Sequence, residues 1–423
     1  MSEGSTLPLR TAIEGALPDR PFTLEFWDGG RVEATRDGGP VVSFRSPAAI
    51  SHVLRAPGEL GLGRAYVTGE IEIDDIDKVM DLLGRFQAPP MGPIQKARFG
   101  LAAARAAGFK RPPPPPAAEL QPPGKRHTKR FDSETVRHHY DVSNEFFALF
   151  LDESMTYSCA LFADGAQTLE EAQFAKLDLV CRKVGLEPGT RLLDIGSGWG
   201  SMGIHAAREF GAKVTGITLS PPQAELANQR AREAGVGELC EFRVQDYRDL
   251  GNERFDSISS IGMIEHVGGD NIDEYAACIE KALDEDGRVL NHGITWTEPE
   301  VHLGADFSER YVFPGGEIPP LSRVLLAFER AGLEPLHVEN IHRDYIETLR
   351  HWAERLDQNL AEAERLAGAE RLRVWRLYLR AARNGFEVGL TSCFQTMLSR
   401  PIVERAGATQ QRSEAEARRP VAG

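Results

Sequence analysis

The central part of the chain alternates short apolar runs with amphipathic stretches. Almost continuously apolar runs predict strands at residues 191–196, 213–219, 240–245, 255–262 and 287–295. Apolar positions at helical spacing predict intervening helices at 199–210, 221–235 and 272–284. Strands of this kind are buried on both faces by helices, which is typical of an open parallel sheet. The pattern therefore predicts an α/β fold with a Rossmann-like sheet.

The flanking regions have different patterns. Before the sheet, alternation and turn residues predict a hairpin at 21–35, a strand at 41–44 and helices at 47–54 and 76–83. We expect these residues to form a small α+β domain over 1–90. Further helices are predicted at 142–151 and 168–185. After the sheet we expect helices at 321–332 and 346–384, strands at 335–341 and 389–398, and a polar tail over 407–423.

Residues 91–130 have the composition of a basic, proline-rich linker. Nine basic residues and one acid, Glu119, lie between residues 95 and 130, and residues 112–116 are all proline, whereas the whole chain has a net charge of −14. The acidic total disfavours nucleic-acid binding. The basic segment suggests contact with anionic lipid, and a solvated linker is the alternative. Its helical pattern at 95–109 fits either a membrane-surface helix or an inter-domain helix.

Composition also bears on the compartment. The five cysteines are scattered, which argues against a disulfide framework and for reducing surroundings. Residues 1–17 lack the apolar core of a signal peptide, and no run of eighteen apolar residues occurs. We therefore expect a cytoplasmic protein.

The first strand leads into a glycine-rich turn with Gly196, Gly198 and Gly200. Such a turn brings the backbone close to a nucleotide-like ligand at the carboxyl end of the strand. A plain tight turn is the alternative. The next strand ends without the carboxylate of dinucleotide sites and offers Thr218 and Gln223 to a ribose. Asp246, after the third strand, is placed to meet an adenine amino group, or else serves as a turn or cap residue.

Two further strand ends carry titratable residues. Glu265 and His266 follow the fourth strand, and His292 lies in the fifth. Charged groups at this edge face the ligand crevice and are costly to bury without a role. A structural ion pair is the alternative for Glu265 and His266, and a satisfied core residue for His292. A third ligand at suitable spacing is missing, so we expect no metal site.

Several motifs together resemble the cyclopropane fatty acid synthase family. The resemblance covers about residues 130–400 and rests on six stretches, namely 139–144, 155–162, 193–200, 216–220, 261–268 and 313–316. Residues 1–90 are more loosely similar to the accessory domain of the longer bacterial members. The resemblance implies an S-adenosylmethionine-dependent class I methyltransferase domain, with helical insertions, over 131–406.

The resemblance also implies roles for individual residues. Cofactor contacts would come from Tyr157, Ser158, Asp194, Gly196, Ser197, Gly198, Thr218, Leu219, Gln223, Gln245 and Asp246. A bound bicarbonate would be held by Cys159, Glu265, His292, the Ile294 backbone and Tyr345. Ser197 stands where members often carry Cys. Ala382 replaces a cysteine that was once proposed as a nucleophile, which excludes a covalent route there.

Methyl transfer to an isolated alkene creates a carbocation, which aromatic rings such as Tyr157, Tyr345, Phe146 and Phe147 can stabilise. Loss of a proton to a base then closes a cyclopropane ring on the acyl chain of an unsaturated phospholipid. A methylene-branched product, later reduced by a partner enzyme, is the alternative on the same substrates. A lipid-binding protein with a vestigial cofactor site is a third. The resemblance further implies peripheral attachment to the inner face of the cell membrane and a homodimer built through the N-terminal domain.

Overall fold

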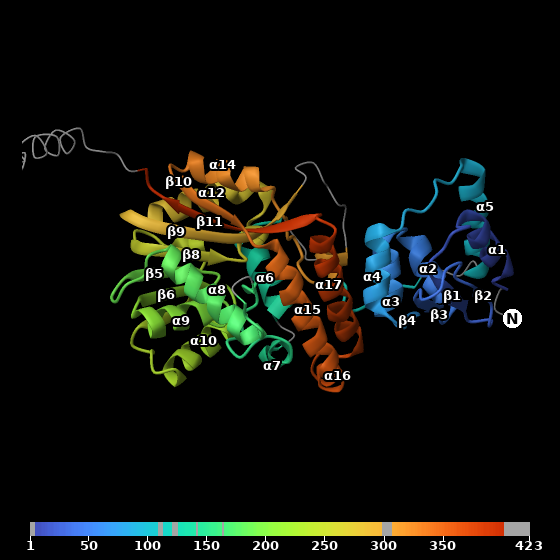
Figure 1. Cartoon of the computed structure of the whole chain (residues 1–423), viewed down its shortest axis with the longest axis horizontal. Coiled ribbons are helices and arrows are strands. Elements are labelled where there is room, and N and C mark those ends of the chain that lie inside the picture. Colours follow the sequence, from blue (N-terminus) through green and yellow to red (C-terminus); the bar gives the residue numbers. More distant parts are fainter. Residues whose placement is uncertain are drawn as a thin grey trace, which may run out of the picture.

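The computed structural model describes residues 5–108, 113–120, 126–140, 143–162, 165–297 and 307–401. A seven-stranded sheet of order β10-β11-β9-β8-β5-β6-β7 forms its centre (Figure 1). Its strands are β5 (Arg191–Ile195), β6 (Lys213–Thr218), β7 (Cys240–Val244), β8 (Phe255–Ile261), β9 (Leu283–Trp296), β10 (Glu334–Asn340) and β11 (Thr391–Ser399). The pairs from β7 to β9 are all parallel. Only β11 runs against its neighbours β9 and β10.

Helices cover both faces of this sheet (Figure 1). On one face α8 (Leu169–Lys183), α9 (Ser201–Phe210) and α10 (Pro221–Glu233) pack against β5, β6 and β7. On the other face α12 (Ile272–Ala282) and α14 (Leu321–Arg330) pack against β5, β8 and β9. The predicted α/β class is therefore confirmed, because near-continuous apolar strands need helices on both sides.

The register of β11 on β9 was not accessible from the sequence. β11 inserts between β9 and β10, so that Gln395 lies opposite His292 and Cys393 lies opposite Ile294. On its other side β9 pairs with β8, with His292 opposite Ile261. Cys393 and Gln395, which follow His292 by about 100 positions in the chain, thus lie next to its ring near the end of the fifth predicted strand.

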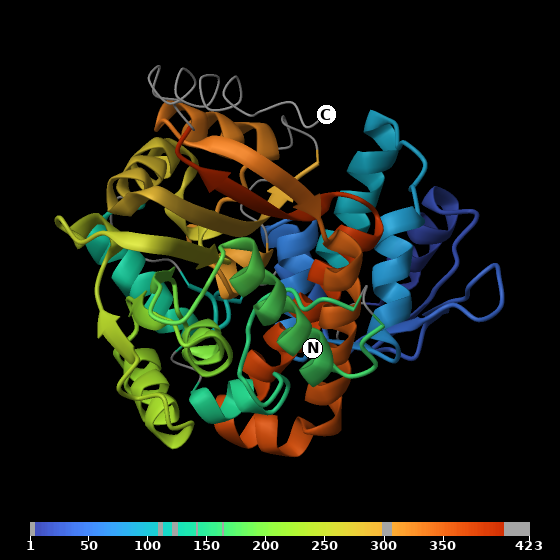
Figure 2. The ribbon, with the colours of Figure 1, turned by 60° about the vertical axis from the view of Figure 1, so that its left-hand side comes forward.

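A helical layer lies beyond the carboxyl ends of the central strands (Figure 2). It contains α7 (Asn144–Ala148), α13 (Phe307–Tyr311) and three helices in place of the single stretch predicted at 346–384. These are α15 (His342–Gln358), α16 (Leu360–Ala367) and α17 (Ala369–Glu387). Gly368 has a φ of 80° and ends α16 in a conformation that other residues rarely adopt. Helix α6 (Lys129–Tyr140), which the pattern did not predict, follows the linker.

The N-terminal part has a four-stranded sheet of order β2-β1-β3-β4. Its elements are α1 (Leu7–Ala16), β1 (Thr23–Phe26), β2 (Arg31–Val32), β3 (Val41–Phe44), α2 (Pro47–Arg55), α3 (Glu59–Val67), β4 (Ile71–Ile73), α4 (Ile76–Arg85) and α5 (Pro93–Ala106). Helix α1 was missed. It packs its buried Leu9 and Ile13 with the alanine-rich face of α5. The division of the chain at residue 90 stays a prediction.

The N-terminal part lies at one end of the molecule and is joined to the rest by α17 (Figure 1). Arg380 of α17 donates to Asp77 of α4 and to Asp357 of α15. The tail over 407–423 and part of the proline-rich segment fall outside the described residues. Within the described ranges, no helix has the length and apolarity needed to cross a bilayer.

Candidate functional site

A pocket opens at the carboxyl ends of β5, β6 and β8, where an open α/β sheet binds its ligands. All eleven residues predicted to contact the cofactor line this pocket, from Tyr157 and Ser158 through the glycine turn to Gln245 and Asp246. None of the five residues predicted to hold bicarbonate lines it. The structure therefore separates the two predicted groups into a pocket and an adjoining cluster.

The glycine turn needs its glycines for conformation and for space. Gly196 and Gly198 have φ values of 78° and 52°. A Cβ at Gly196 would lie 2.5 Å from Cγ of Met263. The amides of Gly196 and Ser197 both donate to the carbonyl of Ile217. This geometry ties the turn to β6 and leaves its outer side open to a ligand.

Several buried polar atoms face this pocket without a hydrogen-bond partner among the described residues. The Thr218 hydroxyl donates to Oε1 of Gln223 at 2.7 Å, and Nε2 of Gln223 is left without an acceptor. The hydroxyl of Ser197 and Oδ2 of Asp194 are also unsatisfied within the described residues. Burial raises the pKa of Asp194 to about 6, although Oδ1 accepts a hydrogen bond from Ser259. Buried polar atoms of this kind indicate a polar ligand.

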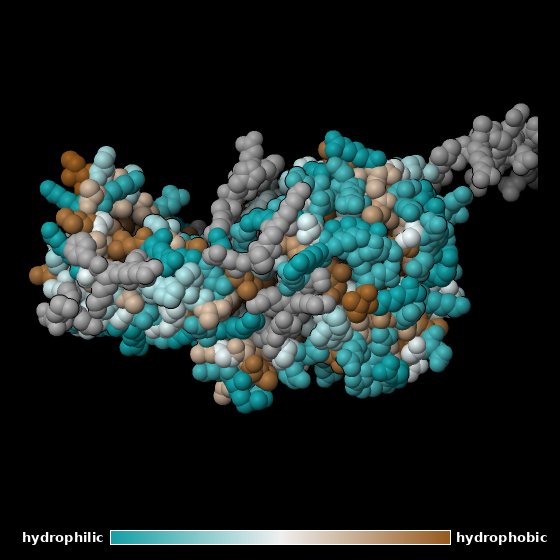
Figure 3. Space-filling view, turned by 180° about the vertical axis from the view of Figure 1, so that it is seen from behind, coloured by the Kyte–Doolittle hydropathy of each residue, from teal (hydrophilic) through white to brown (hydrophobic). Residues whose placement is uncertain are grey.

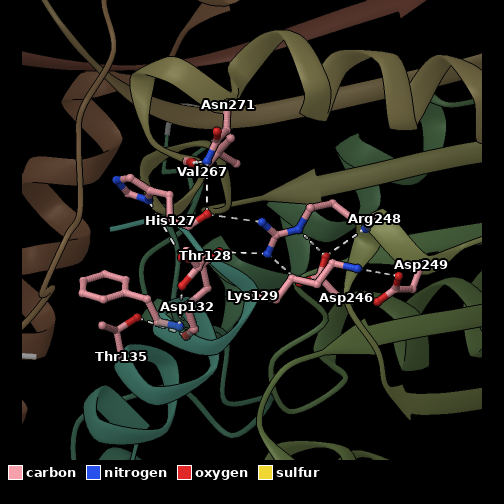
Figure 4. A network of polar contacts seen from close by, with 11 residues as sticks. His127, Thr128, Lys129, Asp132, Thr135, Asp246, Arg248, Asp249, Val267 and Asn271 are labelled. Carbon is pink, nitrogen blue, oxygen red and sulfur yellow. Dashed lines mark hydrogen bonds and ion pairs between the residues drawn. The ribbon is translucent and has the colours of Figure 1, made fainter. Parts of the chain in front are cut away.

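Asp246 belongs to a polar network whose members include the pocket-lining residues Asp132 and Arg248 (Figure 4). Arg248 donates to both carboxylate oxygens of Asp246, at 2.8 and 2.6 Å, and to Asp132 of α6 at 2.8 Å. The Asp246 carboxylate also accepts from the Arg248 amide. Burial opposes ionisation of Asp246, but the hydrogen bonds from Arg248 lower its pKa below the ordinary value. The carboxylate therefore acts as a cap and an ion-pair partner here.

Glu265 and His266 follow β8 on α11 (Ile264–Val267), and no ion pair joins them in the part of the chain described. Oε1 of Glu265 accepts from the Ile294 amide at 2.6 Å. Oε2 is buried without a hydrogen-bond partner among the described residues. Burial raises the pKa of Glu265 to about 7. The His266 ring instead lines the cofactor pocket and packs against Phe313.

His292 lies in β9 between two residues of β11. Gln395 accepts from the Lys183 ammonium with Oε1, at 2.7 Å, so its Nε2 faces Nδ1 of His292 at 3.4 Å. This assigns Nδ1 as the acceptor and places the ring proton on Nε2, which faces Sγ of Cys393 at 3.3 Å. Burial, with the nearby Lys176 and Lys183 cations, lowers the pKa of His292 to about 3. The imidazole is therefore neutral at physiological pH.

Cys159 and Tyr345 approach the same cluster from other elements. Cys159 is fully buried, and its Sγ lies 3.7 Å from the carbonyl of Ile341, whose amide donates to the carbonyl of Cys393. Burial raises the pKa of Tyr345 well above its ordinary range, and the nearby acidic groups Tyr378 and Cys393 add to this effect. The Tyr345 ring packs against Phe386, with ring centroids 4.7 Å apart. The five residues predicted to hold bicarbonate thus lie around the end of β9.

Aromatic rings pack around Tyr157, which lines the pocket. Tyr157 packs against Phe147, Trp352 and Trp375, with ring centroids 5.1 to 6.2 Å apart. Phe146 and Phe147 are fully buried in the same hydrophobic core. Part of the 139–144 motif falls outside the described residues.

Three residues that contribute to the site were not predicted from the sequence: Lys176, Arg248 and Cys393. Lys176 could have been found, because it occupies a buried position in the apolar stripe that includes Leu169, Ala172 and Val180 of α8. Arg248 and Cys393 give no such signal, since their roles depend on α6 and on the register of β11.

Comparisons with known proteins agree with this geometry. The sequence model of the mycolic acid cyclopropane synthetase family matches residues 127–396 of this chain. A probable fatty acid methyltransferase of Pseudomonas putida is 38% identical over 91% of this chain and 93% of its own. The cyclopropane-fatty-acyl-phospholipid synthase of Escherichia coli is 32% identical over 85% of this chain and 88% of its own.

Solved structures lead to the same family. The cyclopropane synthase MmaA2 from Mycobacterium tuberculosis is 34% identical, with a TM-score of 0.61 over 63% of this chain and 98% of its own. The mycolic acid cyclopropane synthase CmaA1, complexed with SAH and CTAB, is 32% identical, with a TM-score of 0.60 over 63% and 97%. The chain therefore belongs to the mycolic acid cyclopropane synthetase family and is an S-adenosylmethionine-dependent methyltransferase that acts on lipid acyl chains.

Proposed function

We propose that the protein forms cyclopropane rings on the unsaturated acyl chains of phospholipids. The observation that carries this proposal is the buried Glu265 carboxyl, which the Ile294 amide anchors to β9 two residues after His292, beside the cofactor pocket. Ring closure needs a proton acceptor in a dry site beside the reacting carbon, and this cluster has that character.

The pocket suits S-adenosylmethionine. When bound, this cofactor supplies an electrophilic methyl group. Gln223 and Ser197 offer buried polar atoms that lack hydrogen-bond partners within the described residues, and Asp194 offers a carboxylate oxygen. The turn at Gly196 allows close approach of the backbone. Tyr157, which directly precedes Ser158, packs in the aromatic core, where electron-rich rings can stabilise positive charge on an acyl chain.

We assign bicarbonate to the cluster beside the pocket. When bound, it supplies the base for ring closure. Oε2 of Glu265 offers an acceptor to its hydroxyl. The Nε2–H of His292 faces only the weak acceptor Sγ of Cys393, and we assign it to the oxygens of the anion instead. Tyr345 and Cys159 complete the group that we assign to it. Glu265 orients the anion, because a carboxylate with a raised pKa accommodates a second anion by holding a proton between the two.

The products decide this proposal. We expect purified protein with S-adenosylmethionine and unsaturated phospholipid vesicles to yield lipids heavier by one methylene, measured by mass spectrometry. Proton NMR of the lipid should show cyclopropane protons upfield of any alkene signal. An unchanged lipid mass would contradict methyl transfer, and a new alkene signal would contradict ring closure.

A methylene-branched acyl product is the second candidate. One relative is named for the methylation of a fatty acid. It is the tuberculostearic acid methyltransferase UfaA1 of Mycobacterium tuberculosis, which is 31% identical over 90% of this chain and 88% of its own. Both products share the methyl transfer and differ in which proton is lost. A separate reductase would then be needed as a partner. The NMR measurement separates the two candidates, because their masses are equal.

Helix α5 is the surface that we propose for membrane attachment. Ile94 and Leu101 are 72% and 48% exposed, and the exposed Arg98 and Arg105 share their helical face. Figure 3 shows hydrophobic beside hydrophilic residues at this end of the molecule. The alanine-rich face of α5 packs inward against α1, so it is not the membrane anchor. Exposed apolar and basic residues on one face are typical of helices that bind anionic lipid.

Vesicle sedimentation tests this attachment. We expect wild-type protein to sediment with anionic phosphatidylglycerol vesicles, and the double variant Arg98→Glu/Arg105→Glu to remain in solution. Leu326→Ser, which removes an exposed apolar side chain from α14, is the matched control and should sediment normally. Equal sedimentation of both variants would contradict a role for α5. Dimer formation through the N-terminal part remains a prediction, which light scattering checks.

A further inference from the structure

Lys176 of α8 is a buried amine to which the proposed chemistry assigns no role. Its side chain lines the cofactor pocket, and the residue is 1% exposed. Its ammonium donates to the hydroxyl of Ser158 at 3.0 Å. One neutral acceptor satisfies only one of the three protons of an ammonium group.

The acids near Lys176 do not neutralise it by direct contact. Asp152 accepts from the amides of Ser154 and Thr156. Asp194 accepts from Ser259 with one oxygen, and its other oxygen has no hydrogen-bond partner in the described ranges. No ion pair within those ranges includes Lys176. Burial lowers the pKa of Lys176 to about 8, so the amine is still mostly protonated at neutral pH.

The position of Lys176 identifies the part of the ligand that it faces. Thr218 and Gln223, at the end of β6, lie where open α/β sheets hold the ribose of a nucleotide. Lys176 lies near Asp194 at the end of β5 and near His292 of β9 and Cys393 of β11, two strands on the side of β5 away from β6. Its partner Ser158 lines the same pocket. The amino-acid end of the cofactor therefore lies toward Lys176. That end carries a carboxylate, and a buried cation without a direct acidic partner is its natural complement.

We propose that Lys176, with the Ser158 hydroxyl, binds the α-carboxylate of S-adenosylmethionine. The Asp194 carboxylate then faces the α-ammonium of the same group. The ligand carboxylate neutralises a charge that is costly to bury alone, so this contact contributes to cofactor affinity. The inference rests on the pocket being the cofactor site of the proposed function.

Calorimetry with two ligands tests this assignment. S-adenosylmethionine carries the carboxylate, whereas decarboxylated S-adenosylmethionine keeps the sulfonium and the amine. Lys176→Met should weaken binding of the first by about tenfold to a hundredfold, the range for a hydrogen bond to a charged group. It should leave binding of the second unchanged. Lys213→Met, at an exposed position of β6, is the control and should bind both ligands as the wild type does.

The outcomes separate the two proposals. Failure of the wild type to bind S-adenosylmethionine would overturn the cofactor assignment itself. Wild-type binding with equal losses of both ligands in Lys176→Met would overturn only the carboxylate contact, as would no loss of either. Lys176→Gln, which keeps a donor to Ser158, provides the same comparison if the methionine variant does not fold. Above about pH 8, affinity for S-adenosylmethionine should fall more steeply in the wild type than in Lys176→Met, which keeps the titration of the ligand's own amine and lacks that of Lys176.

Discussion

At the scale of single residues, Glu265 has surroundings that favour a proton on a carboxyl group. Burial raises its pKa to about 7, because it outweighs the support that the amides of Ile294 and of Glu265 itself give to the charge. Near neutral pH the group is therefore partly protonated, as the orientation of a second anion requires.

Replacement of Glu265 by Gln should reduce turnover by about a hundredfold or more, the usual contribution of a group that serves acid–base chemistry. The amide keeps the acceptor for Ile294 but loses the acidic proton. Calorimetry should show unchanged cofactor affinity, because Glu265 does not line the pocket. Glu285→Gln, at an exposed position of β9, is the control. Wild-type turnover in Glu265→Gln would exclude the proposed role.

The same substitution has a pH-dependent effect on stability. The folded-state pKa of Glu265 lies above the unfolded value, so its protonation stabilises the fold below the unfolded pKa, and this contribution is lost as pH rises through about 7. The amide introduced by Glu265→Gln cannot ionise. Urea unfolding should therefore show this variant more stable than wild type by up to about 3 kcal/mol above pH 8, and equal near pH 4. A difference that is independent of pH would contradict burial of the charge.

At the scale of elements, α6 is held across the cofactor pocket by one guanidinium. Arg248 joins Asp132 of α6 to Asp246 at the end of β7, and its Nη1 lies 3.5 Å from the carbonyl of His127 (Figure 4). Lys129 of α6 adds a more exposed pair with Asp249. The helix and the sheet edge therefore meet mainly through charged side chains.

Arg248→Met should destabilise the protein by about 3 to 5 kcal/mol, because two carboxylates lose the guanidinium that they share. Hydrogen exchange, read by mass spectrometry, should become faster in α6. Arg243→Met removes partly exposed pairs with Glu241 and Glu253 and should change stability by less than about 1 kcal/mol. Unchanged exchange in α6 would show that other contacts hold the helix.

At the scale of the whole molecule, a buried ion pair connects the N-terminal part to the rest. Arg64 of α3 forms two hydrogen bonds of 2.6 Å to Glu119, and their side chains are 8% and 1% exposed. Tyr311 of α13 donates to the same carboxylate at 3.2 Å. Three segments that are distant in sequence therefore share one carboxylate.

Glu119→Gln should destabilise the protein by about 3 kcal/mol, because it leaves the Arg64 guanidinium buried without its counter-charge. Chemical unfolding measures this loss. Glu25→Gln, in an exposed pair with Arg31, should cost less than about 1 kcal/mol. Equal effects of the two substitutions would mean that solvent reaches Glu119.

The central sheet and the cofactor pocket could be predicted because their signals are local. Apolar runs, the glycine turn and the polar residues at strand ends all depend on short stretches of sequence, and the parallel topology brings those ends to one edge. Helix α1 and helix α6 were missed, and the predicted helix at 346–384 proved to be three. Helix boundaries are set by packing as much as by propensity.

The sequence by itself determined the α/β class, the family and eleven of the residues that line the pocket, because these follow from periodicity and from motifs of a few neighbouring residues. Tertiary structure alone decided the partners of those residues. The insertion of β11 brings Gln395 and Cys393 to His292, and α6 brings Asp132 to Arg248. Burial, which no local pattern specifies, sets the pKa values of Glu265 and Lys176. Charge and proton positions in the site therefore depend on contacts between segments far apart in the chain.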